Sequence, residues 1–121
     1  MGNKKINPVK NLALAKILSE IVDELKKSFS KKLHKVFLYG SYARGEATSE
    51  SDMDIFVLVN VPDVDSRKYL NKLVKVGVDI SIKHNIVPMI IPENSNEFYD
   101  NIDVIPLFRN IKREGILLYE A

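Results

Sequence analysis

Apolar residues in the first quarter of the chain recur at steps of three and four residues. This spacing runs from about residue 8 to residue 29 and predicts an amphipathic helix that packs across a sheet. The expected buried stripe consists of Leu14, Ile17, Leu18, Ile21, Val22 and Leu25. Pro8 suits the first helical turn, because the N–H that it lacks would have no partner there. The polar residues before Pro8 are expected to form a loose leader.

Two apolar runs follow that contain β-branched and aromatic residues, which favour strands. They span residues 33–39 and about 53–60, and the polar segment between them begins with Gly40-Ser41. A short helix is expected to begin near Ser41. The sequence therefore predicts a strand, a short helix and a second strand in this part of the chain.

The next part of the chain changes from a helical to a strand-like pattern. A helix capped within residues 65–66 is expected to end at Gly77. Residues 78–82 then alternate apolar and polar side chains, which predicts a strand with one buried face. The apolar run at 86–91 contains Pro88, so it is predicted to be an edge strand or a bent extension.

The C-terminal quarter is predicted to be mostly helical. Asn94 or Ser95 is expected to cap a short helix. A last helix over about residues 105–114 is expected to end at Gly115, and residues 116–119 to form a short strand or a docking segment. Because no repeat, linker or low-complexity tract interrupts these patterns, we expect a single α/β domain over the whole chain.

The composition says more about the cellular location of the protein than about its function. The 121 residues contain 18 Lys and Arg against 16 Asp and Glu, a formal net charge of +2, so direct nucleic-acid binding is neither required nor expected. There is no cysteine, which excludes disulfide and thiol chemistry. No apolar stretch is long enough to span a bilayer, and the N-terminus lacks the apolar core of a signal peptide. We therefore expect a cytoplasmic protein that does not associate with membranes.

The polar segment after the first predicted strand has the features of a phosphate site. Gly40 has no Cβ, so a ligand can approach its backbone closely. A helix that begins at Ser41 would point unpaired N–H groups and a positive dipole end outward. Arg44, one turn later, could reach a triphosphate with its forked guanidinium, and a surface ion pair with Glu46 is the equal alternative.

Two carboxylates end the same segment. Asp52 and Asp54 are two residues apart, so on a strand they project from the same face and repel each other. Hard oxygen ligands beside a phosphate site indicate Mg²⁺ that holds a nucleotide. The alternative is a turn before the strand in which an Asp side chain caps the backbone.

These features form a pattern that resembles a known signature. Gly40-Ser41, ten further residues and Asp52-x-Asp54 are similar to the signature of the polymerase-β-type nucleotidyltransferase superfamily. The stretch GSYARGEATSESDMDIFV resembles the MNT-type proteins, which are minimal nucleotidyltransferases, and residues 108–119 resemble the end of that group. The resemblance implies a small α/β fold with a short mixed sheet flanked by helices. It also implies that Asp52 and Asp54 are the metal-binding pair.

The reaction of this superfamily places further demands on the site. A hydroxyl attacks the α-phosphorus of a nucleoside triphosphate as pyrophosphate leaves, and two metal ions about 4 Å apart can neutralise the developing charge. Two Mg²⁺ ions need more than two carboxylates, so a third is expected on a neighbouring strand. Asp79, at the start of the predicted strand 78–82, is the candidate for this metal ligand and for the acceptor of the hydroxyl proton. The alternative is an exposed acid without such a role.

The resemblance implies an activity, a partner and two competing functions. The implied activity is Mg²⁺-dependent transfer of AMP from ATP to a hydroxyl. MNT-type proteins of this size are typically antitoxins paired with a HEPN-type ribonuclease toxin, so the implied acceptor is a tyrosine of that toxin. A second possibility is an antitoxin that neutralises a HEPN partner by contact alone, with residues 116–119 as one docking surface. A third is a nucleotidyltransferase that modifies a small molecule such as an antibiotic.

Overall fold

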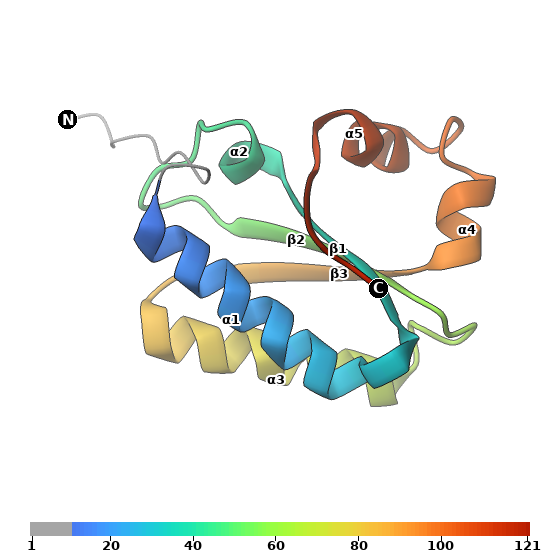
Figure 1. Cartoon of the computed structure of the whole chain (residues 1–121), viewed down its shortest axis with the longest axis horizontal. Helices are drawn as coiled ribbons and strands as arrows, with labels where there is room; N and C mark the ends of the chain where they lie inside the picture. The colour runs from blue at the N-terminus through green and yellow to red at the C-terminus, as the bar shows by residue number, and fades with distance from the viewer. Residues whose placement is uncertain (1–10) are drawn as a thin grey trace.

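The computed structural model describes residues 11–121, which form a mixed sheet with helices on both of its faces (Figure 1). In chain order the elements are α1 (Leu12–Phe29), a 3₁₀ turn (Ser30–Lys32), β1 (Leu33–Tyr39), α2 (Gly40–Ala43), β2 (Met53–Val59), α3 (Arg67–His84), β3 (Pro88–Asn94), α4 (Ser95–Asp100), α5 (Pro106–Glu114) and β4 (Ile116–Glu120). The predicted leader and the predicted helical turn at Pro8 lie outside the described residues. In the described part, no helix has both the length and the apolar character needed to cross a bilayer.

The four strands lie in the order β3-β2-β1-β4. β1 runs antiparallel to β2 and to β4, whereas β2 and β3 are parallel and are joined by the crossover helix α3. α1 and α3 lie against one face of the sheet, and α4 and α5 lie against the other (Figure 1). The expected α/β fold with a short mixed sheet flanked by helices is therefore confirmed.

β2 is buried on both faces and forms the centre of the core. Ile55 and Val57 pack into the larger apolar cluster, with residues of α1 and α3. Phe56 and Leu58 point the other way, into a smaller cluster with residues of α4 and α5. Because side chains alternate along a strand, Asp54 lies on the same face as Phe56, at the end where the smaller cluster stops.

The amphipathic helix predicted for the first quarter of the chain is present as α1. Its buried residues are Leu14, Leu18, Ile21, Leu25 and Phe29. Burial of each such side chain stabilises the fold by about 1.5–3 kcal/mol. Asn11 caps the helix, because its Oδ1 accepts a hydrogen bond from the N–H of Leu14 at 2.9 Å.

The region between β2 and β3 differs from the prediction. The helix expected to end at Gly77 continues as α3 to His84, so the strand predicted for residues 78–82 is wrong. Val76 and Ile80 are both buried and lie one turn apart, which continues the helical stripe through the supposed strand.

The misleading alternation comes from apolar residues that α3 leaves on the surface. Val78 and Ile82 are 49% and 81% exposed, although together with Ile80 they follow the period of a strand. The helix ends at Asn85, which adopts the left-handed conformation with φ 55°, and not at Gly77.

The C-terminal part of the chain matches the prediction more closely. β3 is an edge strand that contains Pro88, as expected. Asn94 caps α4, with its Oδ1 accepting a hydrogen bond from the N–H of Glu97 at 3.1 Å. α5 ends at Gly115, and the segment after it forms β4, which pairs with β1. Of the two alternatives for that segment, the strand is therefore confirmed.

Candidate active site

The chain turns sharply between β1 and the one-turn helix α2. Gly40 adopts a positive φ of 73°, and a Cβ at this position would collide with the carboxylate of Asp54. The glycine is thus required both by the backbone conformation and by the close approach of Asp54. Ser41 follows as the second residue of α2. The structure therefore brings Gly40, Ser41 and Asp54 to the same end of the paired strands.

Asp52 and Asp54 lie at the start of β2. Asp54 is opposite Tyr39 in the antiparallel register, and Asp52 comes immediately before the strand. Burial raises the pKa of Asp54 above its usual value, the negative charge of Asp52 raises it further, and the Arg44 guanidinium opposes both effects. The two carboxylates therefore lie close enough to repel each other, as the spacing in the sequence predicts.

Neither carboxylate is neutralised by a direct partner in the described part of the chain. Between residues 11 and 121, Asp52 and Asp54 accept no hydrogen bond and form no salt bridge, so no backbone cap of the alternative kind is found there. Ser51 makes the local bond instead, because its hydroxyl accepts the N–H of Thr48 at 2.9 Å. Two such carboxylates on one face suit a divalent cation.

Two tyrosines border the carboxylates. Burial raises the pKa of Tyr39 to about 12, and the charge of Asp54 contributes to this shift. Burial and then the charge of Asp52 also raise the pKa of Tyr42, whose side chain is only 2% exposed. Tyr42 therefore packs in the core and does not offer its ring to a nucleotide base. Both phenols keep their protons at neutral pH.

Arg44 follows α2 and pairs with two glutamates. Its Nε lies 3.4 Å from Oε2 of Glu46, and its Nη1 lies 3.7 Å from Oε2 of Glu114. The pair with Glu46 is the alternative predicted from the sequence, whereas Glu114 belongs to α5, far along the chain. Because exposed ion pairs of this kind contribute little stability, Arg44 can exchange them for a phosphate group.

Asp79 lies on the other side of the sheet. It projects from α3 into a recess of about 300 Å³ that is also lined by Glu24, Lys27 and Lys72. α3 packs against the face opposite to that of Asp54 (Figure 1), so the predicted third carboxylate does not join the pair. Among the described residues, no group of three or more His, Cys, Asp or Glu side chains could hold a metal ion. The prediction for Asp79 fails because it assumed a strand where the chain forms a helix.

Met89 occupies the place beside Asp54 on the neighbouring strand. The two residues are paired in the parallel register of β2 and β3, and paired residues project to the same face of a sheet. The Met89 side chain is 46% exposed and carries no charge. Sequence reasoning missed it because the register of two strands joined by a helix cannot be counted along the chain. Within the part of the chain that the structure describes, the site thus has two carboxylates where three were expected.

This arrangement can hold a metal-bound polyphosphate. The two carboxylates offer hard oxygen ligands to a cation such as Mg²⁺. The backbone N–H groups at the start of α2 and the guanidinium of Arg44 can donate hydrogen bonds to phosphate oxygens. The candidate phosphate ligands come from α2 and the residue after it, and the candidate cation ligands from the start of β2.

Comparison with known proteins points to one family. A family model described as a nucleotidyltransferase domain matches residues 18–109. A Methanocaldococcus jannaschii protein with the name "putative protein adenylyltransferase" is 34% identical over 104 residues, which cover 86% of this chain and 96% of that protein. Another protein of the same organism and name is 39% identical over 72 residues, which cover 56% of this chain and 71% of that protein.

Two solved structures have a similar fold. A chain of a toxin–antitoxin complex with AMP-PNP superposes with a TM-score of 0.59 and 16% identity, over 86% of this chain and 73% of that chain. A chain of the complex between a tri-AMPylated Shewanella oneidensis HEPN toxin and an MNT antitoxin gives a TM-score of 0.52 and 14% identity, over 87% of this chain and 71% of that chain. At these identities the likeness establishes the fold alone.

Proposed function

This chain belongs to the nucleotidyltransferase domain family, and we propose that it transfers AMP from ATP to a tyrosine hydroxyl of a HEPN-type ribonuclease toxin. The observation that carries the proposal is the approach of Asp54, with Asp52 beside it, to the turn at Gly40 and Ser41. Relatives named as protein adenylyltransferases support AMP as the transferred group and a protein as the acceptor. The complex of an AMPylated HEPN toxin with an MNT antitoxin supports a toxin as that protein.

The carboxylate pair fits a divalent cation. Asp52 and Asp54 are oxygen donors without a direct cationic partner in the described residues, and their repulsion contributes to the raised pKa of Asp54. When bound, Mg²⁺ would neutralise phosphate charge and orient the triphosphate. Because the described residues supply two clustered carboxylates and not three, the chain's own ligands support one Mg²⁺ ion and not the expected two.

In the proposed reaction, the acceptor oxygen forms a bond to the α-phosphorus of ATP as the bond from that phosphorus to the pyrophosphate oxygen breaks. Arg44, the Ser41 hydroxyl and the backbone N–H groups of α2 would donate hydrogen bonds to the phosphate oxygens as negative charge moves onto pyrophosphate. The acceptor proton would pass to solvent, because none of residues 11–121 places a third carboxylate beside the pair. This favours tyrosine, since a phenol with a pKa of about 10 releases its proton more readily than an aliphatic hydroxyl.

The test uses the purified chain, ATP labelled at the α-phosphate, Mg²⁺ and a purified HEPN-type protein. We expect label on a tyrosine of the HEPN-type protein, together with loss of its ribonuclease activity. Asp52→Asn should abolish both effects, because it removes one of the two cation ligands. A HEPN-type protein that stays unlabelled under conditions where its activity is lost would contradict the proposal.

Neutralisation of a HEPN partner by contact alone is the second candidate. Met89 in place of a third carboxylate favours it, because a protein that only binds needs no complete metal site. The predicted docking segment at residues 116–119 lies in β4, the edge strand next to β1. Asp52→Asn separates the two candidates: a variant that still inhibits the unlabelled toxin would support contact. No feature of the described residues favours a small-molecule acceptor, so that possibility ranks third.

A further inference from the structure

The positive charge of the chain is concentrated in two short stretches, residues 26–35 and 67–75. These basic stretches contain nine of the eighteen Lys and Arg residues and no Asp or Glu, so the other nine share the rest of the chain with all sixteen acidic residues. The formal net charge of +2 therefore hides a strong separation of charge. The nine residues are Lys26, Lys27, Lys31, Lys32, Lys35, Arg67, Lys68, Lys72 and Lys75.

The fold brings the two basic stretches together where α1 ends and α3 begins (Figure 1). The rings of Phe29 and Tyr69 are stacked, with their centroids 5.6 Å apart. Nζ of Lys72 on α3 donates to the backbone carbonyl of Ser28 at 3.0 Å, and Nζ of Lys32 in the 3₁₀ turn donates to the Tyr69 hydroxyl at 3.1 Å. Two stretches that are distant in sequence therefore form one surface.

Three ammonium groups gather around the ring of Tyr69. The Nζ atoms of Lys32, Lys68 and Lys72 lie 5.7, 5.4 and 5.7 Å from the ring centroid, within the range of cation–π attraction. Tyr69 itself is only 5% exposed, so its ring holds the lysines in place and is not free to stack on a base. We call Lys32, Lys68 and Lys72 the lysine cluster.

The lysine cluster has no acidic partner among residues 11–121. None of its members forms a salt bridge there, and their two hydrogen bonds go to neutral groups, the Tyr69 hydroxyl and the Ser28 carbonyl. Asp63 and Asp65, in the loop before α3, are exposed and form no salt bridge with the cluster either. The three ammonium groups therefore repel one another, and a bound anion would relieve this repulsion.

Further along the two helices the charge is balanced. Glu24 and Asp79 line the recess of about 300 Å³ between α1 and α3, together with lysines of both helices. Beyond the recess, Glu20 of α1 pairs with Lys83 of α3. The uncompensated positive charge is therefore confined to the end of the helices where Tyr69 lies.

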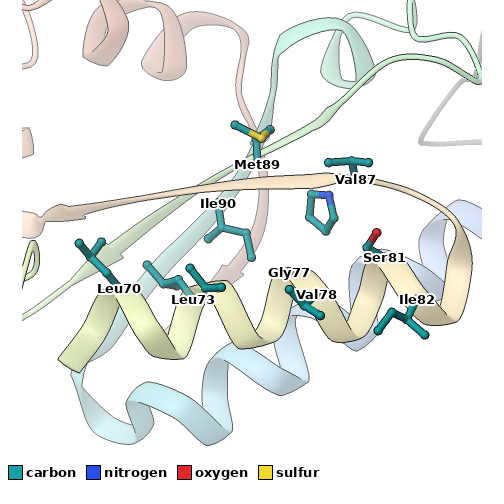
Figure 2. A pocket seen from close by; sticks show the side chains of 11 residues that line it. Leu70, Leu73, Gly77, Val78, Ser81, Ile82, Val87, Met89 and Ile90 are labelled. Atoms are coloured by element: carbon teal, nitrogen blue, oxygen red, sulfur yellow. The ribbon is translucent and has the colours of Figure 1, made fainter. Parts of the chain in front are cut away.

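The surroundings of the cluster fit nucleic acid better than protein. The core of a protein interface needs apolar or aromatic anchors, whereas nucleic-acid interfaces are polar and positively charged. In the two basic stretches, the large apolar side chains that are exposed are Leu70 and Val74, and both line a pocket against β3 instead (Figure 2). The cluster itself offers lysine ammonium groups, which bind phosphate as point charges.

We propose that the lysine cluster binds the phosphodiester backbone of a nucleic-acid strand without preference for base sequence. Lys75 extends the cluster, because Lys68, Lys72 and Lys75 follow one another at steps of four and three residues and form a row along α3. The cluster lies at the start of β1 and the turn at Gly40 at its end, and the seven residues of this strand span about 20 Å. The inference therefore concerns a second site and does not depend on AMP transfer.

An anisotropy titration with fluorescent single-stranded RNA of about 20 nucleotides tests the proposal. The test variant combines Lys32→Gln, Lys68→Gln and Lys72→Gln, which remove the three charges and keep polar side chains. We expect its affinity to be at least about tenfold weaker, and the slope of log affinity against log salt concentration to be smaller by about two. Absence of salt-dependent binding by the unchanged chain, or an unchanged slope in the variant, would overturn the proposal.

A second triple variant is the matched control for net charge. It combines Lys16→Gln, Lys83→Gln and Lys112→Gln, at exposed positions outside the two basic stretches. Because salt screens charges that are distant from the bound strand, its RNA affinity should stay within about threefold of that of the unchanged chain. Equal losses in the two triple variants would assign the binding to net charge alone and would overturn the proposal.

Thermal unfolding, which needs no ligand, shows whether a loss of binding reflects the site or the fold. Both triple variants should unfold at nearly the temperature of the unchanged chain, because most of the substituted side chains are exposed. Lys68→Glu reverses one charge at a single exposed position and should also weaken RNA binding, by more than Lys68→Gln does. Equal RNA affinities of Lys68→Glu and the unchanged chain would overturn the proposal.

Two competitors identify the anion. Single-stranded DNA of the same sequence separates the two sources of a phosphodiester backbone: tighter binding of RNA or of DNA assigns the source, and equal affinities show that the shared backbone alone is bound. Polyglutamate offers carboxylates in place of phosphates and should compete poorly. Polyglutamate that displaces RNA as well as unlabelled RNA does, at equal charge concentration, would assign the cluster to acidic protein segments and would overturn the proposal.

Discussion

The two faces of the central sheet carry different chemistry. The face toward α1 and α3 is apolar along the whole of β2, and Asp79, the one acid of α3, is exposed. The face toward α4 and α5 is apolar from Phe56 onward but ends in Asp54 and Tyr39. An acidic side chain can therefore join the site only if its strand or helix directs it to the face toward α4 and α5. Asp54 on β2 meets this condition, whereas Asp79 on α3 does not.

Asp54→Asn should have the largest effect on the reactive face. It preserves the shape of the side chain but removes the charge that would hold a cation, so AMP transfer is expected to fall by about 1000-fold. The raised pKa of Asp54 means that its charge disfavours the folded state, so thermal unfolding at pH 7 should occur at the same or a higher temperature. An inactive variant with a clearly lower unfolding temperature would instead assign Asp54 a structural role.

Gly40→Ala should have the next largest effect. A Cβ at this position would collide with the Asp54 carboxylate, and displacement of that group by about 1 Å is expected to reduce AMP transfer about 100-fold. Gly45→Ala is the matched control, because Gly45 also has a positive φ, 70°, but a Cβ there would meet nothing within 4 Å. Both variants carry the same backbone strain of about 1–2 kcal/mol. Equal activity in the two would contradict the close packing of Gly40 on Asp54.

The pH dependence of nucleotide binding tests the raised pKa of Asp54. Burial and then the charge of Asp52 raise the pKa of Asp54, so Mg²⁺–AMP-PNP binding should weaken as pH falls through a value above the usual 3.8. The stability that this group contributes is full below its unfolded pKa and is lost as pH rises through its folded pKa. Asp52→Asn removes the second cause, so an NMR titration should show a lower Asp54 pKa in that variant. An unchanged pKa would contradict the proximity of the two carboxylates.

Asp79→Asn should have the smallest effect. The residue is exposed on α3, on the opposite side of the sheet from the carboxylate pair. AMP transfer should change by less than about twofold, and the free energy of unfolding by less than about 0.5 kcal/mol, as for a surface substitution. A loss that matches that of Asp54→Asn in the same transfer assay would return Asp79 to the site and contradict the assignment of the two faces.

The sequence predicts the turn at Gly40 and the carboxylate pair well, and the region after β2 poorly. The turn at Gly40 and the spacing of Asp52 and Asp54 are local features, so their placement could be predicted without knowing the strand register. The Arg44–Glu46 pair is local as well and is present. These predictions depend only on backbone conformation and on the alternation of side chains along one strand.

The region after β2 could not be predicted in the same way. Val78, Ile80 and Ile82 alternate with polar residues like a strand because α3 buries Ile80 but leaves Val78 and Ile82 exposed. Pattern arguments assume that exposed helix positions are polar. The position of Met89 beside Asp54 depends on a parallel register that follows a crossover helix. The supposed strand at residues 78–82 and the unknown register of β3 both depend on contacts distant in sequence. For this reason Asp79 was wrongly predicted to be the third carboxylate of the site.

The most direct test of the central claim is the position of the metal. Crystals of the chain grown with Mn²⁺ and a non-hydrolysable ATP analogue would locate the cation by its anomalous scattering. We predict a peak at bonding distance, about 2 Å, from the carboxylates of Asp52 and Asp54, with the triphosphate beside Gly40 and Ser41. A peak at Asp79, or nucleotide bound without a cation at the carboxylate pair, would contradict the account.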